Sequence, residues 1–63
     1  MSRVVKILMN RDGYSLEEAR EMVITFRKEA IEMMNNGASM ESLEDKLMDD
    51  FMLEPDYLFG LIF

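Results

Sequence analysis

One stretch in the middle of the chain has the hydrophobic spacing of an α-helix. Its apolar positions recur three and four residues apart, at Leu16, Ala19, Val23, Phe26, Ala30 and Met33. This spacing places the side chains along one side of a helix. Ser15 precedes the stretch and Glu18 follows three residues later, which is the pattern of a capping box. Asn35, Asn36 and Gly37 close it, so the pattern predicts a long helix over residues 16–35.

Shorter patterns before and after this stretch predict further helices. A first helix is expected over residues 2–10, although Val4-Val5 and Ile7-Leu8 are also typical of a buried strand. Ser39 is a candidate N-cap for a third helix, whose apolar face is expected at Met40, Leu43, Leu47 and Phe51. Pro55 ends any continuous helix and suits the first position of a short fourth one, with Asp56 in its first turn and apolar residues at Tyr57, Leu58, Leu61 and Ile62. The predicted fold is all-α, a single domain (residues 1–63) with three to four helices around a long central one.

The size of the chain raises the question of how its apolar surface is covered. A domain of 63 residues is only marginally stable on its own, and small domains are commonly supported by disulfides, metals or self-association. This chain has no cysteine and no histidine, so disulfides and the commonest metal ligands are absent. Either the C-terminal segment covers the stripe of the long helix, or a second chain shares it. We expect a homo-oligomer, a homodimer or a larger assembly.

The charge of the chain is unevenly distributed. Residues 1–28 carry six basic and four acidic groups, whereas residues 29–63 carry one basic and nine acidic groups. Nucleic acid is therefore not an expected partner, because phosphate contacts need clustered lysine and arginine. The acidic third helix also argues against a helix-turn-helix motif. No apolar run approaches the ~20 residues of a membrane span, and without a signal segment we expect a cytoplasmic protein.

No group of residues predicts catalysis or metal binding. The run from Leu8 to Gly13 has a faint likeness to a calcium loop but lacks ligands at its first and last positions. Neighbouring aspartates such as Asp49 and Asp50 point in different directions on a helix, so they form a poor cage. The serines have no histidine to activate them. We predict no catalytic, cofactor or metal residues and no enzymatic activity.

The chain is rich in methionine, with eight in 63 residues. Methionine fills irregular gaps in cores and also recurs at adaptable binding surfaces. Most of the methionines fall on or beside apolar faces, which favours the core. Met34 and Met52 are the candidates for exposed contacts.

Two segments carry a resemblance to other proteins. Residues 10–19 (NRDGYSLEEA) and 53–58 (LEPDYL) resemble stretches of small helical proteins of bacteria and their phages. The resemblance implies an all-helical fold and a mobile-element origin. It carries over no catalytic or binding residue, since the shared motifs are caps and turns.

Three functional hypotheses follow from these patterns. The first is a non-enzymatic protein-interaction module, or a small structural or regulatory protein, that associates with itself or with a host protein; its expected contact residues are Val23, Ile24, Phe26, Ile31, Met34, Tyr57, Phe59 and Phe63. The alternative is an acidic phage-type inhibitor that occupies a nucleic-acid-binding site on a host protein; its candidate residues are Glu41, Glu44, Asp45, Asp49, Asp50, Glu54 and Asp56. The third is an antitoxin or small regulator, in which DNA binding would depend on Arg3, Lys6 and Arg11, which are few for that task.

Overall fold

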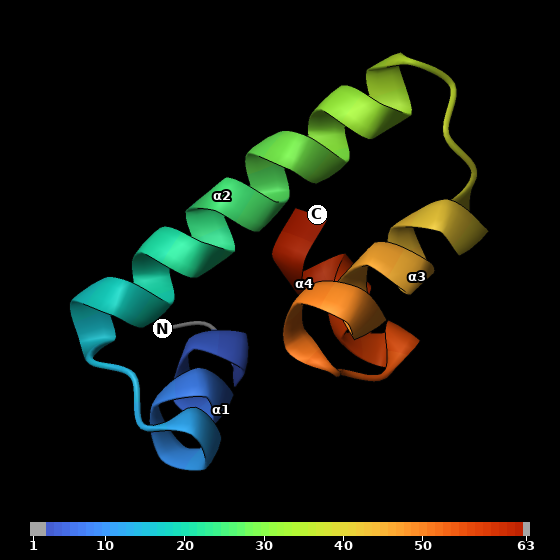
Figure 1. The fold of residues 1–63 in the computed structure, drawn as a ribbon. Helices are drawn as coiled ribbons and strands as arrows, with labels where there is room; N and C mark the ends of the chain where they lie inside the picture. The colour runs from blue at the N-terminus through green and yellow to red at the C-terminus, as the bar shows by residue number, and fades with distance from the viewer. Residues whose placement is uncertain (1–2, 63) are drawn as a thin grey trace.

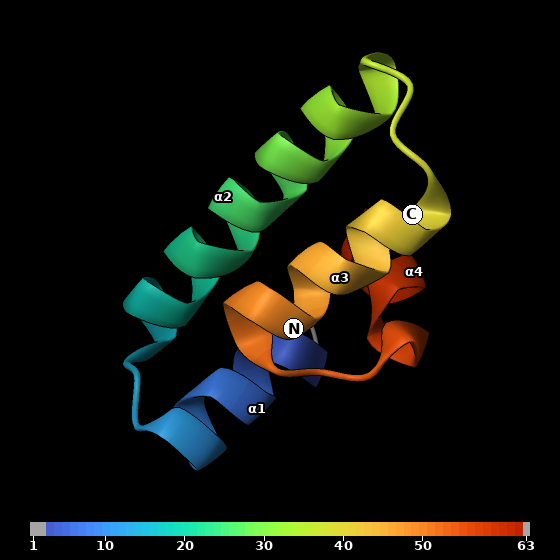
Figure 2. The same ribbon diagram turned by 45° about the vertical axis from the view of Figure 1, so that its right-hand side comes forward.

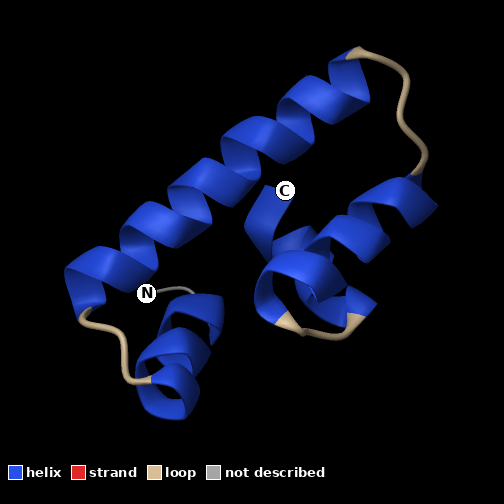
Figure 3. Ribbon diagram, in the orientation of Figure 1, coloured by secondary structure: helices blue, strands red, loops and turns tan. Residues whose placement is uncertain are grey.

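The computed structural model describes residues 3–62, and over this range the chain forms helices joined by short loops (Figures 1 and 3). The order is α1 (Arg3–Asp12), α2 (Leu16–Asn35), α3 (Met40–Phe51), the 3₁₀ turn η1 (Pro55–Tyr57) and α4 (Leu58–Ile62). The all-α prediction is confirmed. The first segment is a helix and not the competing strand, and its expected start at Ser2 lies outside the described residues.

α1 continues two residues beyond the predicted end at Asn10. Gly13 is the first residue with a left-handed backbone, at φ 76°. Its N–H donates to the carbonyl oxygen of Met9 at 3.2 Å, which is a common way to close a helix with a left-handed glycine. The helix therefore ends where glycine permits the left-handed turn, and the polar residues before it remain helical.

α2 begins and ends at the predicted residues. The Glu18 N–H donates to Ser15 Oγ at 3.1 Å, and the Ser15 N–H donates to Glu18 Oε1 at 3.1 Å. These two bonds form the predicted capping box. At the other end Gly37 has φ 88° and donates to the Met34 carbonyl at 3.0 Å, while Ala38 donates to the Met33 carbonyl at 2.9 Å. This pair of bonds is a Schellman motif.

The shorter helices all lie on one side of α2 (Figures 1 and 2). α2 is 20 residues long, or roughly 30 Å at 1.5 Å per residue, and the molecule measures 33 × 19 × 18 Å. α1 lies beside the N-terminal part of α2, and α3 runs back along α2 in the opposite direction (Figure 2). One face of α2 is thus covered along its length, and the other is left to solvent.

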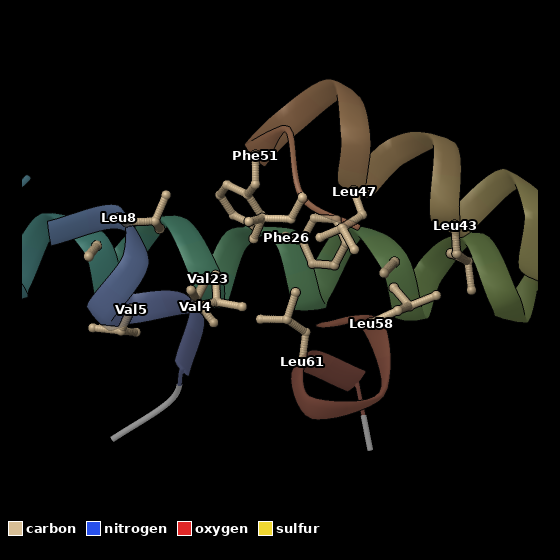
Figure 4. Packing of buried hydrophobic residues seen from close by; sticks show 13 residues of the cluster. Val4, Val5, Leu8, Val23, Phe26, Leu43, Leu47, Phe51, Leu58 and Leu61 are labelled. Atoms are coloured by element: carbon tan, nitrogen blue, oxygen red, sulfur yellow. The ribbon is translucent and has the colours of Figure 1, made fainter. Parts of the chain in front are cut away.

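The core draws on every described helix. Its buried residues are Val4, Val5, Leu8, Ala19, Val23, Phe26, Ala30, Leu43, Leu47, Phe51, Leu53, Leu58 and Leu61. Phe26 projects from the middle of α2 into the space between α3 and α4 (Figure 4). Its ring centroid is 5.3 Å from that of Phe51 in a tilted arrangement, a favourable geometry for an aromatic pair.

This core corrects one sequence-based argument for self-association. We argued that the stripe on the long helix needed either the C-terminal segment or a second chain to cover it. Ala19, Val23, Phe26 and Ala30 are all buried against α1, α3 and α4 of the same chain. These four residues are therefore covered within one chain, but by α1 and α3 as well as by the C-terminal helix α4, so any reason for self-association must come from another surface.

α3 ends with an unusual residue and a cap supplied by α1. Met52 has a left-handed backbone, at φ 54° and ψ 46°. The Arg11 guanidinium donates from Nη2 to the Phe51 carbonyl at 2.6 Å and from Nη1 to the Met52 carbonyl at 3.4 Å. Asp12 accepts from Nη2 and Nε of the same guanidinium at 2.8 and 3.0 Å. A cation is thereby held at the negative end of α3.

Candidate interaction surface

The uncovered face of α2 carries a line of alternating aliphatic and cationic residues. We call this the outer line of α2, and it consists of Leu16, Arg20, Ile24, Arg27 and Ile31. Its members are three or four residues apart and so share one side of the helix. Ile24 and Ile31 are 44% and 41% exposed, and Leu16, which the spacing assigned to the apolar stripe, is 38% exposed and lies at the border between that stripe and the outer line. The exposed aliphatic side chains therefore lie in a row with cations between them.

The outer line points away from α3. At about 100° per residue, Ile24 and Ile31 stand roughly 140–160° around the helix from Phe26. Phe26 is buried in the core, and Glu29 on the α3 side of the helix pairs with Lys46. The described ion pairs involve Arg11 and Lys46, and neither arginine of the outer line takes part in them.

α3 presents a surface of opposite charge. Its outer face consists of Glu41, Asp45, Met48 and Asp49, together with Met52 just beyond the helix. Met48 is 49% exposed and Met52 is 75% exposed. The acidic side chains surround these two flexible apolar ones, so the face combines negative charge with an adaptable hydrophobic centre.

The one lysine of α3 is turned toward α2 and does not neutralise this face. Lys46 Nζ lies 2.9 Å from both Glu29 Oε1 and Asp50 Oδ2, and 5.4 Å from the ring centroid of Phe26. Partial burial lowers the pKa of Lys46, but the hydrogen bonds and charges of Asp50 and Glu29 outweigh it and raise the pKa above its usual value. The Lys46 ammonium therefore forms ion pairs with one carboxylate of α2 and one of α3.

An open hollow of about 480 Å³ lies beside this ion pair, between α2 and α3. The rings of Phe26 and Phe51 line it together with Glu21 and Asp49. The described residues contain no group of three or more acidic, histidine or cysteine side chains that could hold a metal ion. Ser15 and Ser39 use their hydroxyls as helix N-caps, accepting from the Glu18 and Ser42 N–H groups.

The eight predicted contact residues divide into four groups, of which one is a buried pair. Ile24, Ile31 and Phe59 are exposed, at 44%, 41% and 63%. Met34 and Tyr57 are half-buried, and the Arg3 guanidinium lies 4.7 Å from the Tyr57 ring centroid. Phe63 lies outside the described residues.

Two of the predicted contact residues require correction. Val23 and Phe26 are only 8% and 1% exposed. They pack inside the chain's own core, so no partner can reach them without disrupting it. Hydrophobic spacing identified them as part of an apolar face but could not say that α1, α3 and α4 would cover that face.

The sequence-based prediction considered apolar residues and did not include Arg20 and Arg27. The spacing of residues 16, 20, 24, 27 and 31 does carry a signal, since each is three or four residues from the next and all therefore share one side of a helix. Among the methionines, Met52 is strongly exposed as predicted, whereas Met34 is half-buried.

The residues of the other two hypotheses are also placed by the structure. Of the acidic set, Glu44 is half-buried and the others are exposed, with Asp50 engaged by Lys46. Arg3 and Arg11 are engaged by Tyr57 and by the end of α3. Two of the three basic groups proposed for DNA binding therefore already have contacts within the fold.

Comparisons of the chain with protein-family models, curated proteins and solved structures find no match. Among the described residues, no helix is both long and apolar enough to cross a membrane. The surface itself is therefore the basis for a functional proposal.

Proposed function

We propose that this protein is a non-enzymatic protein-interaction module that associates with copies of itself through the outer line of α2. The observation that carries the proposal is the row formed by Leu16, Ile24 and Ile31, each more than a third exposed. Single exposed aliphatic residues are ordinary. Aligned ones on a single helix face are characteristic of surfaces that pack against a partner.

The complete core supports this interpretation. Among the described residues, thirteen apolar side chains form a buried core that does not include the outer line. Leu16, Ile24 and Ile31 each keep more than a third of their surface exposed. Covering these side chains with a second surface would remove their apolar area from water, and each Å² buried in this way stabilises the complex by about 25 cal/mol.

Sedimentation equilibrium tests the proposal directly. The wild-type chain is measured from micromolar to millimolar concentration beside the double variant Ile24→Gln, Ile31→Gln. We expect the wild-type mass to rise above that of one chain and the variant to remain a single chain at the same concentrations. The matched control is Tyr14→Gln with Met40→Gln, which removes two side chains of similar exposure (38% and 43%) outside the outer line. A wild-type protein that stays monomeric throughout, or a double variant that associates equally well, would contradict the proposal.

A second candidate function is the acidic inhibitor of a host nucleic-acid-binding protein. The observation that favours it is the outer face of α3, whose carboxylates are not paired with Lys46 because that lysine contacts Glu29 and Asp50. Binding of this kind should weaken steeply with ionic strength, since exposed charges are screened over about 10 Å at 0.1 M salt.

Immobilised protein exposed to an extract of the native cell provides the test. A captured protein should elute as salt is raised and should be displaced by added DNA or RNA. Retention that is indifferent to salt, or a captured protein that nucleic acid does not displace, would reject the inhibitor function.

A further inference from the structure

We infer that copies of this chain associate head to tail, with the outer line of α2 in one copy docked on the outer face of α3 in the next. This inference rests on the proposed self-association and specifies its geometry. It follows from the charges on the two surfaces and from their positions in the fold.

The charges on α2 disfavour pairing of two outer lines with each other. An antiparallel, symmetric pair that sets Leu16 of one copy against Ile31 of the other also sets Arg20 against Arg27 of the other copy. The symmetry repeats this contact, so in this register four arginines meet in one interface, with Glu17 and Glu21 beside Arg20 along the same surface. Like charges placed together across an interface are costly.

The outer face of α3 carries negative charge, which complements the arginines of the outer line of α2, and it also carries exposed methionines that can contact the aliphatic side chains of that line. Arg20 and Arg27 are seven residues apart, roughly 10 Å along the helix. Glu41 and Asp49 are eight residues apart on α3, roughly 12 Å at the same rise, so both arginines can meet a carboxylate at once. Met48 lies between these carboxylates in sequence and is 49% exposed, and its flexible side chain can fit against Ile24 and Ile31.

The two surfaces cannot pair within one chain. α3 runs along α2 (Figure 2) and contacts it on the side that carries Glu29, and at about 100° per residue the outer line stands on the opposite side of the helix. A second copy is the partner that brings the opposite surface. Because each copy then keeps one free surface of each kind, the association is heterologous, and it forms a ring or an open filament according to the rotation between successive copies.

Charge reversal and rescue test this geometry. One variant reverses α2 (Arg20→Glu, Arg27→Glu), and the other reverses the two carboxylates that would meet these arginines on α3 (Glu41→Lys, Asp49→Lys). All four residues are exposed or at the helix surface, and circular dichroism with thermal unfolding checks that each variant folds. The control Glu54→Lys, Asp56→Lys changes the net charge by the same amount as the α3 reversal but lies outside both surfaces.

Head-to-tail docking predicts a specific set of sedimentation results. Each reversed variant alone should have the mass of a single chain at concentrations where the wild type and the control associate. An equimolar mixture of the two variants should regain association, because the acidic α2 of one then meets the basic α3 of the other.

Three outcomes overturn the inference, and they separate it from the proposed function. An α3-reversed variant that still associates alone, as a closed dimer, rejects head-to-tail docking but leaves self-association through α2 standing. Folded variants that fail to associate when mixed also reject it. A wild-type chain that is monomeric at every concentration rejects both the geometry and the proposed function.

Discussion

At the scale of single residues, the end of α3 shows how a local weakness is offset by a distant side chain. Met52 has a left-handed backbone that favours glycine, and an L residue there carries a cost of roughly 1–2 kcal/mol. Arg11 donates to the Phe51 and Met52 carbonyls from 40 and 41 residues away in sequence. The α3 terminus is therefore held by a tertiary contact in place of the glycine that ends α1 and α2.

Met52→Gly should stabilise the protein by about 0.5–1 kcal/mol, because glycine adopts this backbone without strain. The measurement is the midpoint of urea unfolding. Met48→Gly is the matched control and should destabilise by about 1 kcal/mol, since it places glycine inside a helix. Equal effects of the two substitutions would show that the backbone of residue 52 is not strained.

A second prediction at this scale concerns the Glu18 carboxylate and pH. The Ser15 N–H and the Ser15 side chain lower the pKa of Glu18 below its ordinary value of 4.5. A lowered folded-state pKa means that the ionised carboxylate stabilises the fold above pH 4.5, and that this contribution is lost as pH falls through the folded pKa.

Urea unfolding of the wild type and of Glu18→Gln, measured from neutral pH down to below pH 4, tests this. The wild type should be the more stable at neutral pH, and the difference should shrink as the pH falls, because glutamine keeps a capping hydrogen bond but not the charge. Glu17→Gln removes the same charge from the same turn without touching Ser15. A difference between wild type and Glu18→Gln that is constant with pH would exclude this role of Glu18.

At the scale of elements, glycine serves opposite purposes in two helices. Gly37 has φ 88° and closes α2. Gly60 lies inside the short helix α4, and a Cβ atom added at this position would have open space around it, with no neighbouring group within 4 Å. The left-handed backbone at residue 37 favours glycine, whereas Gly60 weakens the helix that contains it.

Gly60→Ala should therefore stabilise the protein by about 0.5–1 kcal/mol, because alanine suits a helix interior better than glycine. Gly37→Ala should destabilise it by about 1 kcal/mol, since the left-handed turn of the Schellman motif strains an L residue. Thermal unfolding followed by circular dichroism measures both. A destabilising Gly60→Ala would indicate that α4 does not form a regular helix in solution.

At the scale of the whole molecule, four helical segments share one core, and Phe26 lies where they meet (Figure 4). It is 1% exposed and packs beside Phe51, and the Lys46 ammonium lies over its ring. Removing it leaves a cavity bordered by more than one helix. The stability of the whole domain should therefore respond to this one side chain.

Phe26→Ala should cost about 3–5 kcal/mol, which is much of the stability expected for a domain of this size. Phe26→Leu, which keeps most of the volume, should cost less, and Phe59→Ala at a 63% exposed position should cost least. Urea unfolding of the three variants gives the comparison. A similar cost for Phe26→Ala and Phe59→Ala would show that the core is not centred on Phe26.

The sequence by itself determined where the helices lie. Ser15, Glu18 and Gly37 act on backbone groups within a few residues of themselves, so their effect can be read without knowing the rest of the fold. The same is true of Ser39 and of Pro55. The predicted end of α1 was two residues too early. The polar residues from Asn10 to Asp12 are all compatible with the start of a turn, but the helix ends only before Gly13, whose backbone is left-handed.

Only the tertiary structure decided which side chains of α2 are buried and which face solvent. Phe26 and Ile24 both favour burial, and spacing alone could not show that α1, α3 and α4 all pack on the side of Phe26. The contact of Arg11 with the end of α3 was equally hidden, because it joins residues 40 apart in sequence. Local hydrogen bonds fix the ends of helices, whereas the burial of a side chain depends on the position of distant parts of the chain.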